Sequence, residues 1–170
     1  NRFMAGGRPF ELGPLGVVYS ANLTPHEETG IGSWTDEQIE LAIRYGVNPS
    51  GRRLFPIMPY EKFFNLAESD VDAIIAFLHT IEPVENEVDR TGPSGEGVAP
   101  VLERTEPLPE NPPDGSDPVE RGSYLVNVVM SCGDCHTPRD PRTGFFAEDM
   151  NLAGGQAYEG PWGIVYGGNI

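Results

Sequence analysis

The sequence predicts a mainly α fold with long loops, arranged as two partial copies of one repeating unit. Three segments carry apolar residues at helical spacing, and no segment of useful length alternates between apolar and polar residues as a strand would. Glycine (21 residues) and proline (17 residues) are abundant in the 170-residue chain, which predicts many turns and irregular connections. Two stretches far apart in the chain match one another, which indicates an internal repeat.

The helical segments have distinct start and stop signals. The first helix is expected to begin at a capping box formed by Thr35 and Gln38 and to end at Gly46. The second covers residues 67–81, with acidic residues in its first turn. Its apolar stripe consists of Val71, Ile74, Ile75, Leu78 and Ile81. The third covers residues 119–130.

The repeat defines the predicted domain organisation. Residues 5–23 (AGGRPFELGPLGVVYSANL) match residues 153–170 (AGGQAYEGPWGIVYGGNI) when Leu12 is skipped. We therefore expect residues 1–90 to be the C-terminal part of one domain and residues 119–170 the N-terminal part of the next. The proline-rich stretch 91–118 between them predicts an extended, semi-rigid linker.

Charge and hydropathy exclude two classes of partner. The chain has 11 Lys and Arg against 26 Asp and Glu, and a net charge of -15 disfavours nucleic acid and anionic lipid as partners. The sequence contains no apolar run near the roughly 20 residues that a membrane-spanning helix needs. Membrane association is therefore expected only through parts not in this chain.

One short motif indicates a specific chemistry. Cys132 and Cys135 are separated by two residues, and His136 follows directly. Two thiols on one turn can bond covalently to the two vinyl groups of a haem, and the adjoining imidazole can then bind the iron. We expect backbone acceptors in the loop after Thr137 and Pro138 to orient the imidazole.

Two other uses of these cysteines remain as alternatives. A zinc site needs four ligands, and the other histidines, His26 and His79, are distant in sequence. A thiol redox pair is typical of a βαβ setting, which the sequence does not predict. The motif therefore favours haem attachment over a metal-binding or thiol redox domain.

Met58 is the best candidate for a second iron ligand. It lies between Pro56 and Pro59, in a loop too rich in proline to be a helix. A thioether on such a stiff loop can bind haem iron and raise its reduction potential. The alternative is a methionine that fills a gap in the core.

These segments together resemble a known family. The stretches GSYLVNVVMSCGDCHTPRD, LAGGQAYEGPWGIVYGGNI, SANLTPHEETGIGSWTDEQIELAIRYGV and GRRLFPIMPYEKFFNLAESDVDAIIAFLHTI resemble tandem class I cytochrome c domains. Such domains occur in the multi-haem cytochrome c subunit of bacterial membrane-bound dehydrogenases for alcohols and related substrates. The resemblance covers nearly all of the chain outside the linker.

The resemblance implies a class I cytochrome c fold and a function. We expect electron transfer through haem c in the periplasm, with no substrate chemistry in this chain itself. The implied partners are a catalytic dehydrogenase subunit or another redox protein upstream and a quinone or terminal oxidase downstream. The methionine of an MPY stretch, here Met58, is the implied sixth iron ligand.

Further residues are candidates for the haem environment. Aromatic and amide residues at matching positions of the repeat could line a haem edge or bind propionates, or could pack in a core. They are Tyr19, Asn22, Trp162, Tyr166 and Asn169. Arg44, Arg52 and Arg53 could pair with a propionate or carry solvated surface charge.

The sixth ligand of the His136 haem leaves two hypotheses. In a tandem array, Met58 serves a second haem in the longer parent protein, and the partner of His136 lies outside this chain. In a circular permutant, Met58 faces His136 itself. The duplicated residues 1–23 favour the tandem array, because a permutant has no use for them. An open sixth position would instead indicate a small-gas binding or sensing module.

Overall fold

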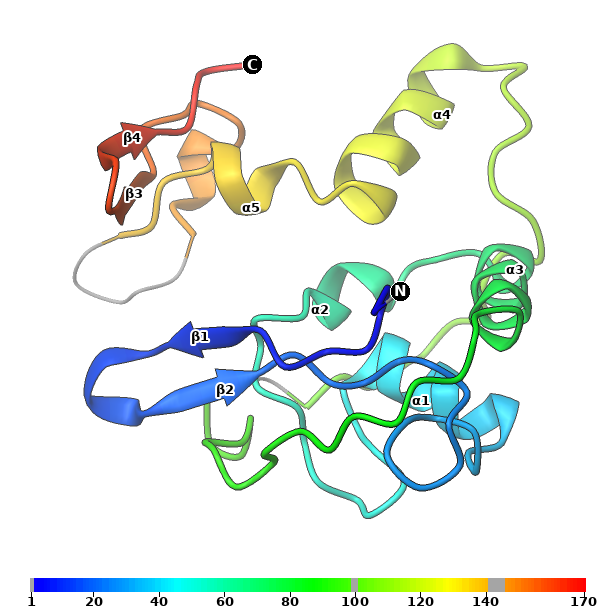
Figure 1. Cartoon of the computed structure of the whole chain (residues 1–170). Coiled ribbons are helices and arrows are strands. Elements are labelled where there is room, and N and C mark those ends of the chain that lie inside the picture. Colours follow the sequence, from blue (N-terminus) through cyan, green and yellow to red (C-terminus); the bar gives the residue numbers. More distant parts are fainter. Residues whose placement is uncertain (1, 99–100, 141–145) are drawn as a thin grey trace. The chain divides into compact units, whose positions relative to one another are not determined.

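The computed structural model describes residues 2–98, 101–140 and 146–170 of the chain. The chain divides into two compact units, Asn1–Pro112 and Pro113–Ile170. In Figure 1 the first unit runs from blue through green and the second from yellow to red. The boundary falls inside the predicted linker, and the described residues of 91–112 group with the first unit.

Helix α1 (Asp36–Tyr45) forms where the capping signals predict it. The Thr35 hydroxyl accepts a hydrogen bond from the Gln38 N–H (3.3 Å), and the Gln38 side chain accepts one from the Thr35 N–H (3.0 Å). These reciprocal bonds satisfy donors that a helix start otherwise leaves open. Gly46 ends the helix in the left-handed conformation, with φ of 63°.

Helix α3 (Glu68–His79) supplies the other half of the first unit's core. The short helix α2 (Tyr60–Phe63) precedes it, and Tyr60 is fully buried. Val71, Ile75 and Leu78 of α3 are buried, as the predicted stripe requires. Ile74 differs, because it lies at the edge of the stripe and is 39% exposed.

The proline-rich segment caps α3. Ala67 at the N-cap position makes no side-chain capping bond. The backbone N–H groups of Glu68 and Ser69 instead donate to the carbonyls of Pro109 (3.1 Å) and Glu110 (3.0 Å). Because the first N–H groups of any helix need acceptors, these two bonds hold this part of the predicted linker against the first unit.

The second unit begins with a helix that changes geometry. Asp117 caps α4 (Pro118–Tyr124), and its carboxylate accepts from the Val119 N–H at 2.8 Å. The chain then continues as a π-helical turn, η2 (Leu125–Val129), so the predicted helix 119–130 is present with its second half widened. Helix α5 (Gly133–His136) and the 3-10 turn η3 (Glu148–Met150) follow. No helix in the described ranges is long and apolar enough to cross a lipid bilayer.

Each unit also contains a β-hairpin, which the sequence did not predict. β1 (Pro9–Glu11) pairs with β2 (Val17–Tyr19), and β3 (Ala157–Gly160) pairs with β4 (Gly163–Tyr166), both antiparallel (Figure 1). The 3-10 turn η1 (Gly13–Leu15) connects the first pair. Strands of three and four residues are too short to show an alternating pattern, which explains the missed prediction.

The two hairpins share one register. Phe10 pairs with Val18, and their repeat partners Tyr158 and Val165 also pair. Met4 and Leu152, at matching positions, adopt φ values of 60° and 61° and accept hydrogen bonds from the matching residues Leu23 and Ile170. The repeat in the sequence is therefore a repeat in backbone conformation as well.

Candidate functional site

One turn of helix presents the three groups of the motif. The His136 N–H donates to the Cys132 carbonyl (3.0 Å), which closes the turn that contains both cysteines. Residues three apart lie on one side of a helix. Cys132 is half-buried and Cys135 is exposed, and neither forms a disulfide. The turn therefore presents two free thiols and an imidazole in the order that covalent haem attachment requires.

A hydrogen bond orients the His136 ring. Its Nδ1 atom lies 2.7 Å from the Gly168 carbonyl oxygen, which can only accept. Nδ1 therefore carries the proton, and Nε2 keeps the lone pair that a metal ligand needs. The predicted acceptor was the loop after Thr137 and Pro138, and this was wrong. The acceptor, Gly168, lies 32 residues after His136, just beyond β4.

Glycines let the backbone approach this turn closely. The Gly154 N–H donates to the His136 carbonyl at 2.6 Å. A Cβ atom on Gly167 would lie 2.2 Å from the Cys135 carbonyl oxygen, so no side chain fits there. The sequence alone did not indicate that these glycines belong to the site. The AGG motif shared by both copies of the repeat was the available signal for Gly154.

Side chains around the turn reinforce the arrangement. Thr137 is buried, and its hydroxyl accepts from the Leu152 N–H at 3.0 Å. The Tyr158 hydroxyl donates to the Asp134 carbonyl at 3.2 Å. Partial burial, followed by a hydrogen bond with Cys135, raises the pKa of Tyr158 to about 12. Tyr158 therefore stays a neutral hydrogen-bond donor at physiological pH.

The second unit fits a large apolar cofactor. Among its described residues, Tyr124 is the one large apolar side chain that is buried. Trp162 is 71% exposed and Tyr166 is 66% exposed, and Asn169 is exposed as well. A unit this poor in buried apolar surface gains a core when a haem covers such side chains, because burial of apolar surface is the main stabilising term. The donor set and this exposed apolar surface are both consistent with haem c.

Met58 belongs to the first unit. It is half-buried, and its carbonyl accepts from the Tyr60 N–H at 2.8 Å. The Tyr60 hydroxyl donates to the Leu54 carbonyl at 3.4 Å. Burial raises the pKa of Tyr60, with a further contribution from the Glu61 carboxylate. Met58 thus lies on a loop that the buried Tyr60, two residues later, anchors in the core.

The other predicted residues of the first unit have protein partners. Asn22 is fully buried, and its amide donates to the Val84 carbonyl (2.8 Å) while its oxygen accepts from Thr24. Arg52 donates to the carbonyls of Gly92 (2.5 Å) and Pro93 (3.2 Å). Both side chains therefore connect loops to the segment that follows α3.

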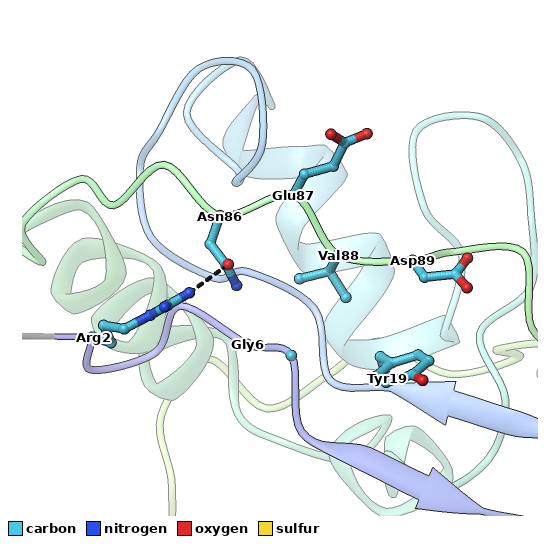
Figure 2. Close-up of a pocket in the computed structure, with 8 residues that line it drawn as sticks. Arg2, Gly6, Tyr19, Asn86, Glu87, Val88 and Asp89 are labelled. Atoms are coloured by element: carbon cyan, nitrogen blue, oxygen red, sulfur yellow. Dashed lines mark hydrogen bonds between the residues drawn. The ribbon is translucent and has the colours of Figure 1, made fainter.

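Tyr19 lines a cavity of about 450 Å³ in the first unit. Figure 2 shows the hydrogen bond between Arg2 and Asn86 at one end of this cavity and Tyr19 with Asp89 at the other. Gly6, the repeat partner of Gly154, also lines it. The cavity thus adjoins the same glycine position that contacts the His136 backbone in the second unit.

Arg44 is buried and has protein partners. Arg44 is 1% exposed, so its guanidinium is not a surface charge. Its guanidinium donates to Glu40 and to the backbone carbonyls of Leu66 and Ala67. Within the described ranges, no group of three or more His, Cys, Asp or Glu side chains is placed to hold a metal ion.

Comparison with known proteins finds relatives that are cytochrome subunits of dehydrogenases. The chain is 37% identical over 166 residues to the cytochrome c subunit of alcohol dehydrogenase (quinone) from Gluconobacter oxydans, matching 89% of this chain and 34% of that subunit. It is 34% identical over 149 residues to the fructose dehydrogenase cytochrome subunit of Gluconobacter japonicus, matching 82% of this chain and 30% of that subunit.

A third relative is described as a diheme protein. The diheme cytochrome c-type protein of Cereibacter sphaeroides is 31% identical over 154 residues, which cover 86% of this chain and 51% of that protein. The chain thus spans about a third of the first two relatives and about half of the third. No protein-family model matches the chain.

Proposed function

We propose that this chain, a relative of the cytochrome c subunits of bacterial dehydrogenases, passes electrons from a dehydrogenase catalytic subunit to a quinone or a terminal oxidase. Covalently bound haem c is the cofactor of this proposal, and the relative named as a diheme cytochrome c-type protein supports it. The observation that carries the proposal is the turn Cys132–His136, whose imidazole Nδ1 is held by Gly168. It leaves Nε2 free to bind iron.

The residues of the turn divide the work of holding the cofactor. Cys132 and Cys135 would form the two thioether bonds, which keep the haem attached when other contacts loosen. His136 would bind the iron through Nε2, and Gly168 and Gly154 fix the position of that ring and its backbone. The haem supplies one-electron redox chemistry, so the chain itself needs no substrate site.

We also propose that the first unit serves a separate haem. The matching hairpins and the matching glycines Gly6 and Gly154 support two copies of one domain type. In the second unit Gly154 contacts the His136 backbone, so the cavity beside Gly6 is the corresponding place for another attachment turn. Met58, in the same unit as Gly6, would be the sixth ligand of that haem.

The net charge of the chain indicates the kind of partner surface, and its relatives indicate the cellular location. The net charge of -15 suits a partner with a basic docking surface, and long-range attraction then raises the association rate. That rate should fall as salt shortens the screening length from about 30 Å at 0.01 M to about 10 Å at 0.1 M. We place the protein in the periplasm, with membrane association through its complex.

Spectroscopy and extraction test the cofactor assignment. The haem should stay with the denatured polypeptide during acid extraction, and mass spectrometry should find no free thiol at Cys132 or Cys135. The ferric full-length protein should be low-spin with a far-red band of thioether ligation. A high-spin spectrum would instead support a gas-binding module, and absence of haem would support a thiol or metal site.

The Met58→Ala variant of the full-length protein tests the tandem assignment. We expect the haem on Cys132 and Cys135 to keep its spectrum while one other haem loses its thioether ligand. Loss of the sixth ligand from the Cys132 and Cys135 haem would instead support the permutant. Electron transfer is tested separately, by reduction of the protein with a dehydrogenase and substrate and reoxidation by a quinone analogue.

A further inference from the structure

The last turn of α1, residues 44–46, contacts the segment after Met58 at three consecutive residues. The Arg44 guanidinium donates to the carbonyls of Leu66 (Nη1, 2.6 Å) and Ala67 (Nη2, 3.3 Å). The rings of Tyr45 and Phe64 pack edge to face with centroids 5.2 Å apart. At Gly46 an added Cβ would lie 2.5 Å from the Tyr60 ring. Only glycine therefore permits this last contact.

The same turn of α1 also holds the segment before Met58. The Leu54 N–H donates to the Gly46 carbonyl at 2.6 Å. Val47 and Arg53 form an isolated antiparallel bridge beside it. The loop that carries Met58 is therefore pinned at both ends to residues 44–47 of the chain.

Backbone hydrogen bonds, together with the peptide bond between Phe63 and Phe64, connect Met58 to the Arg44 contact. The Tyr60 N–H donates to the Met58 carbonyl (2.8 Å), and the Phe64 N–H donates to the Tyr60 carbonyl (2.7 Å). The Leu66 N–H then donates to the Phe63 carbonyl at 3.0 Å. We therefore expect a shift at Leu66 to reach the backbone of Met58 through these bonds.

Burying the Arg44 guanidinium costs desolvation free energy, so its position needs a structural reason. Among the described residues its acidic partner is Glu40, which lies 2.7 Å from Nε on the same helix and is itself partly exposed. A buried charge with hydrogen bonds to carbonyls is often no more stable than an apolar side chain of the same volume. A planar guanidinium does, however, bind two adjacent carbonyls in one fixed orientation, which lysine cannot do.

We propose that Arg44 is a positioning residue for Met58: it holds the Leu66 and Ala67 carbonyls so that the Met58 thioether stays at the distance that iron ligation requires. This inference rests on the proposed function, in which Met58 binds the iron of a haem. The hydrogen bonds that the structure gives Arg44 go to Glu40, Leu66 and Ala67 and not to Met58, so it would act through the segment 58–67.

The test compares Arg44→Gln, Arg44→Lys and Arg90→Gln in the full-length, haem-loaded protein. Arg90 donates to the Thr29 carbonyl (3.4 Å), so the control removes the same charge from the same unit without touching the Met58 segment. The far-red thioether band is measured on ferric protein and the reduction potentials by redox titration, both under conditions where circular dichroism shows native helix content.

We expect Arg44→Gln to shift the equilibrium towards unligated Met58 by about tenfold or more, because two hydrogen bonds to a charged group are lost. One haem should lose band intensity, and its reduction potential should fall, since thioether ligation raises it. Arg44→Lys should restore part of the band, and it is the second variant to examine if Arg44→Gln does not fold. Arg90→Gln should leave the band unchanged.

Two results would overturn the inference. The first is a band and potential in Arg44→Gln equal to those in Arg90→Gln. The second is loss of the band only in proportion to unfolding. Met58→Ala separates this inference from the proposed function: if that variant keeps every thioether ligand, the assignment of Met58 is itself wrong. If Met58→Ala removes one ligand while Arg44→Gln is silent, only the positioning role fails.

Discussion

The two units contain the same hairpin but differ in what stabilises them. Every buried apolar side chain of the described residues belongs to the first unit, except Tyr124. In the first unit, α1 and α3 bury Ile39, Ile43 and Ile75. In the second unit the hairpin carries Trp162 and Ile164, both more than half exposed.

This difference in burial shows that the conformation of the hairpin and the stability of the unit have different causes. The matching registers and the matching φ values of Gly6 and Gly154 (75° and 77°) arise in both units, with or without a helical core around them. Turn chemistry therefore determines the shape of the hairpin. Burial of apolar surface determines stability, and a covering haem would add the burial that the described side chains of the second unit do not supply.

The largest expected effect is on the second unit when it cannot attach haem. In a Cys132→Ala, Cys135→Ala double variant of these 170 residues, we expect backbone amides of α4, α5 and the β3–β4 hairpin to exchange hydrogen at nearly unfolded rates, because Tyr124 is the one large apolar side chain buried among the described residues of this unit. Amides of α1 and α3 should keep their protection, because their core is made of side chains. Hydrogen exchange with mass spectrometry measures both units in one sample. Protection of β3–β4 in the haem-free variant would contradict the comparison.

A core substitution should act on the first unit alone. Ile75→Ala removes a side chain that is 5% exposed and should lower the free energy of unfolding by about 2–5 kcal/mol. Ile74→Ala is the matched control on the same helix, and its 39% exposure predicts a smaller loss. Urea unfolding followed by α-helical circular dichroism measures both. Equal losses would show that the burial pattern of α3 is misplaced.

The matching glycines offer the same test in both units. Gly6→Ala and Gly154→Ala should each cost about 1–3 kcal/mol or more, because φ is positive and an added Cβ would lie 2.5 Å or 2.6 Å from backbone atoms. Gly155→Ala has a positive φ of 89° but open space around it, so it should cost less. Thermal unfolding of the haem-loaded protein gives the three values. A neutral Gly154→Ala would contradict the close backbone approach.

The smallest expected effect concerns two exposed carboxylates at equivalent kinds of turn. Asp89 accepts from the Thr91 backbone and hydroxyl, and Asp114 accepts from the Ser116 N–H. These bonds hold the pKa of each carboxyl below its usual value of 3.8. Since the folded pKa is the lower one, the stabilisation is present above the usual pKa and is lost as pH falls through the folded value.

Unfolding of Asp89→Asn and Asp114→Asn between about pH 6 and pH 2 measures this effect. Each variant should be slightly less stable than the unmodified protein near neutral pH, and the difference should shrink below about pH 4. Asp72→Asn, which removes an exposed carboxylate from α3, is the control for net charge. A difference that is the same at every pH would show that these turns do not depend on ionised aspartate.

The sequence by itself determined the features that depend on neighbouring residues. The capping box of Thr35 and Gln38, the left-handed Gly46 and the Cys132–His136 turn each involve residues at most four apart, so residue types alone predict them. The repeat likewise predicted that residues 5–23 and 153–170 adopt one conformation. The hairpins themselves were missed, because their strands are too short to carry a pattern.

Only the tertiary structure decided which distant groups these local elements meet. The acceptor for His136 lies 32 residues away, the carbonyls bound by Arg44 lie 22 and 23 away, and the amide of Asn22 reaches Val84 across 62 residues. Each of these partners is a backbone carbonyl, and every residue type has one, so residue identity contains no signal for it. Such contacts depend on how the helices and loops pack, which is why the oriented imidazole and the pinned Met58 loop emerge from the fold alone.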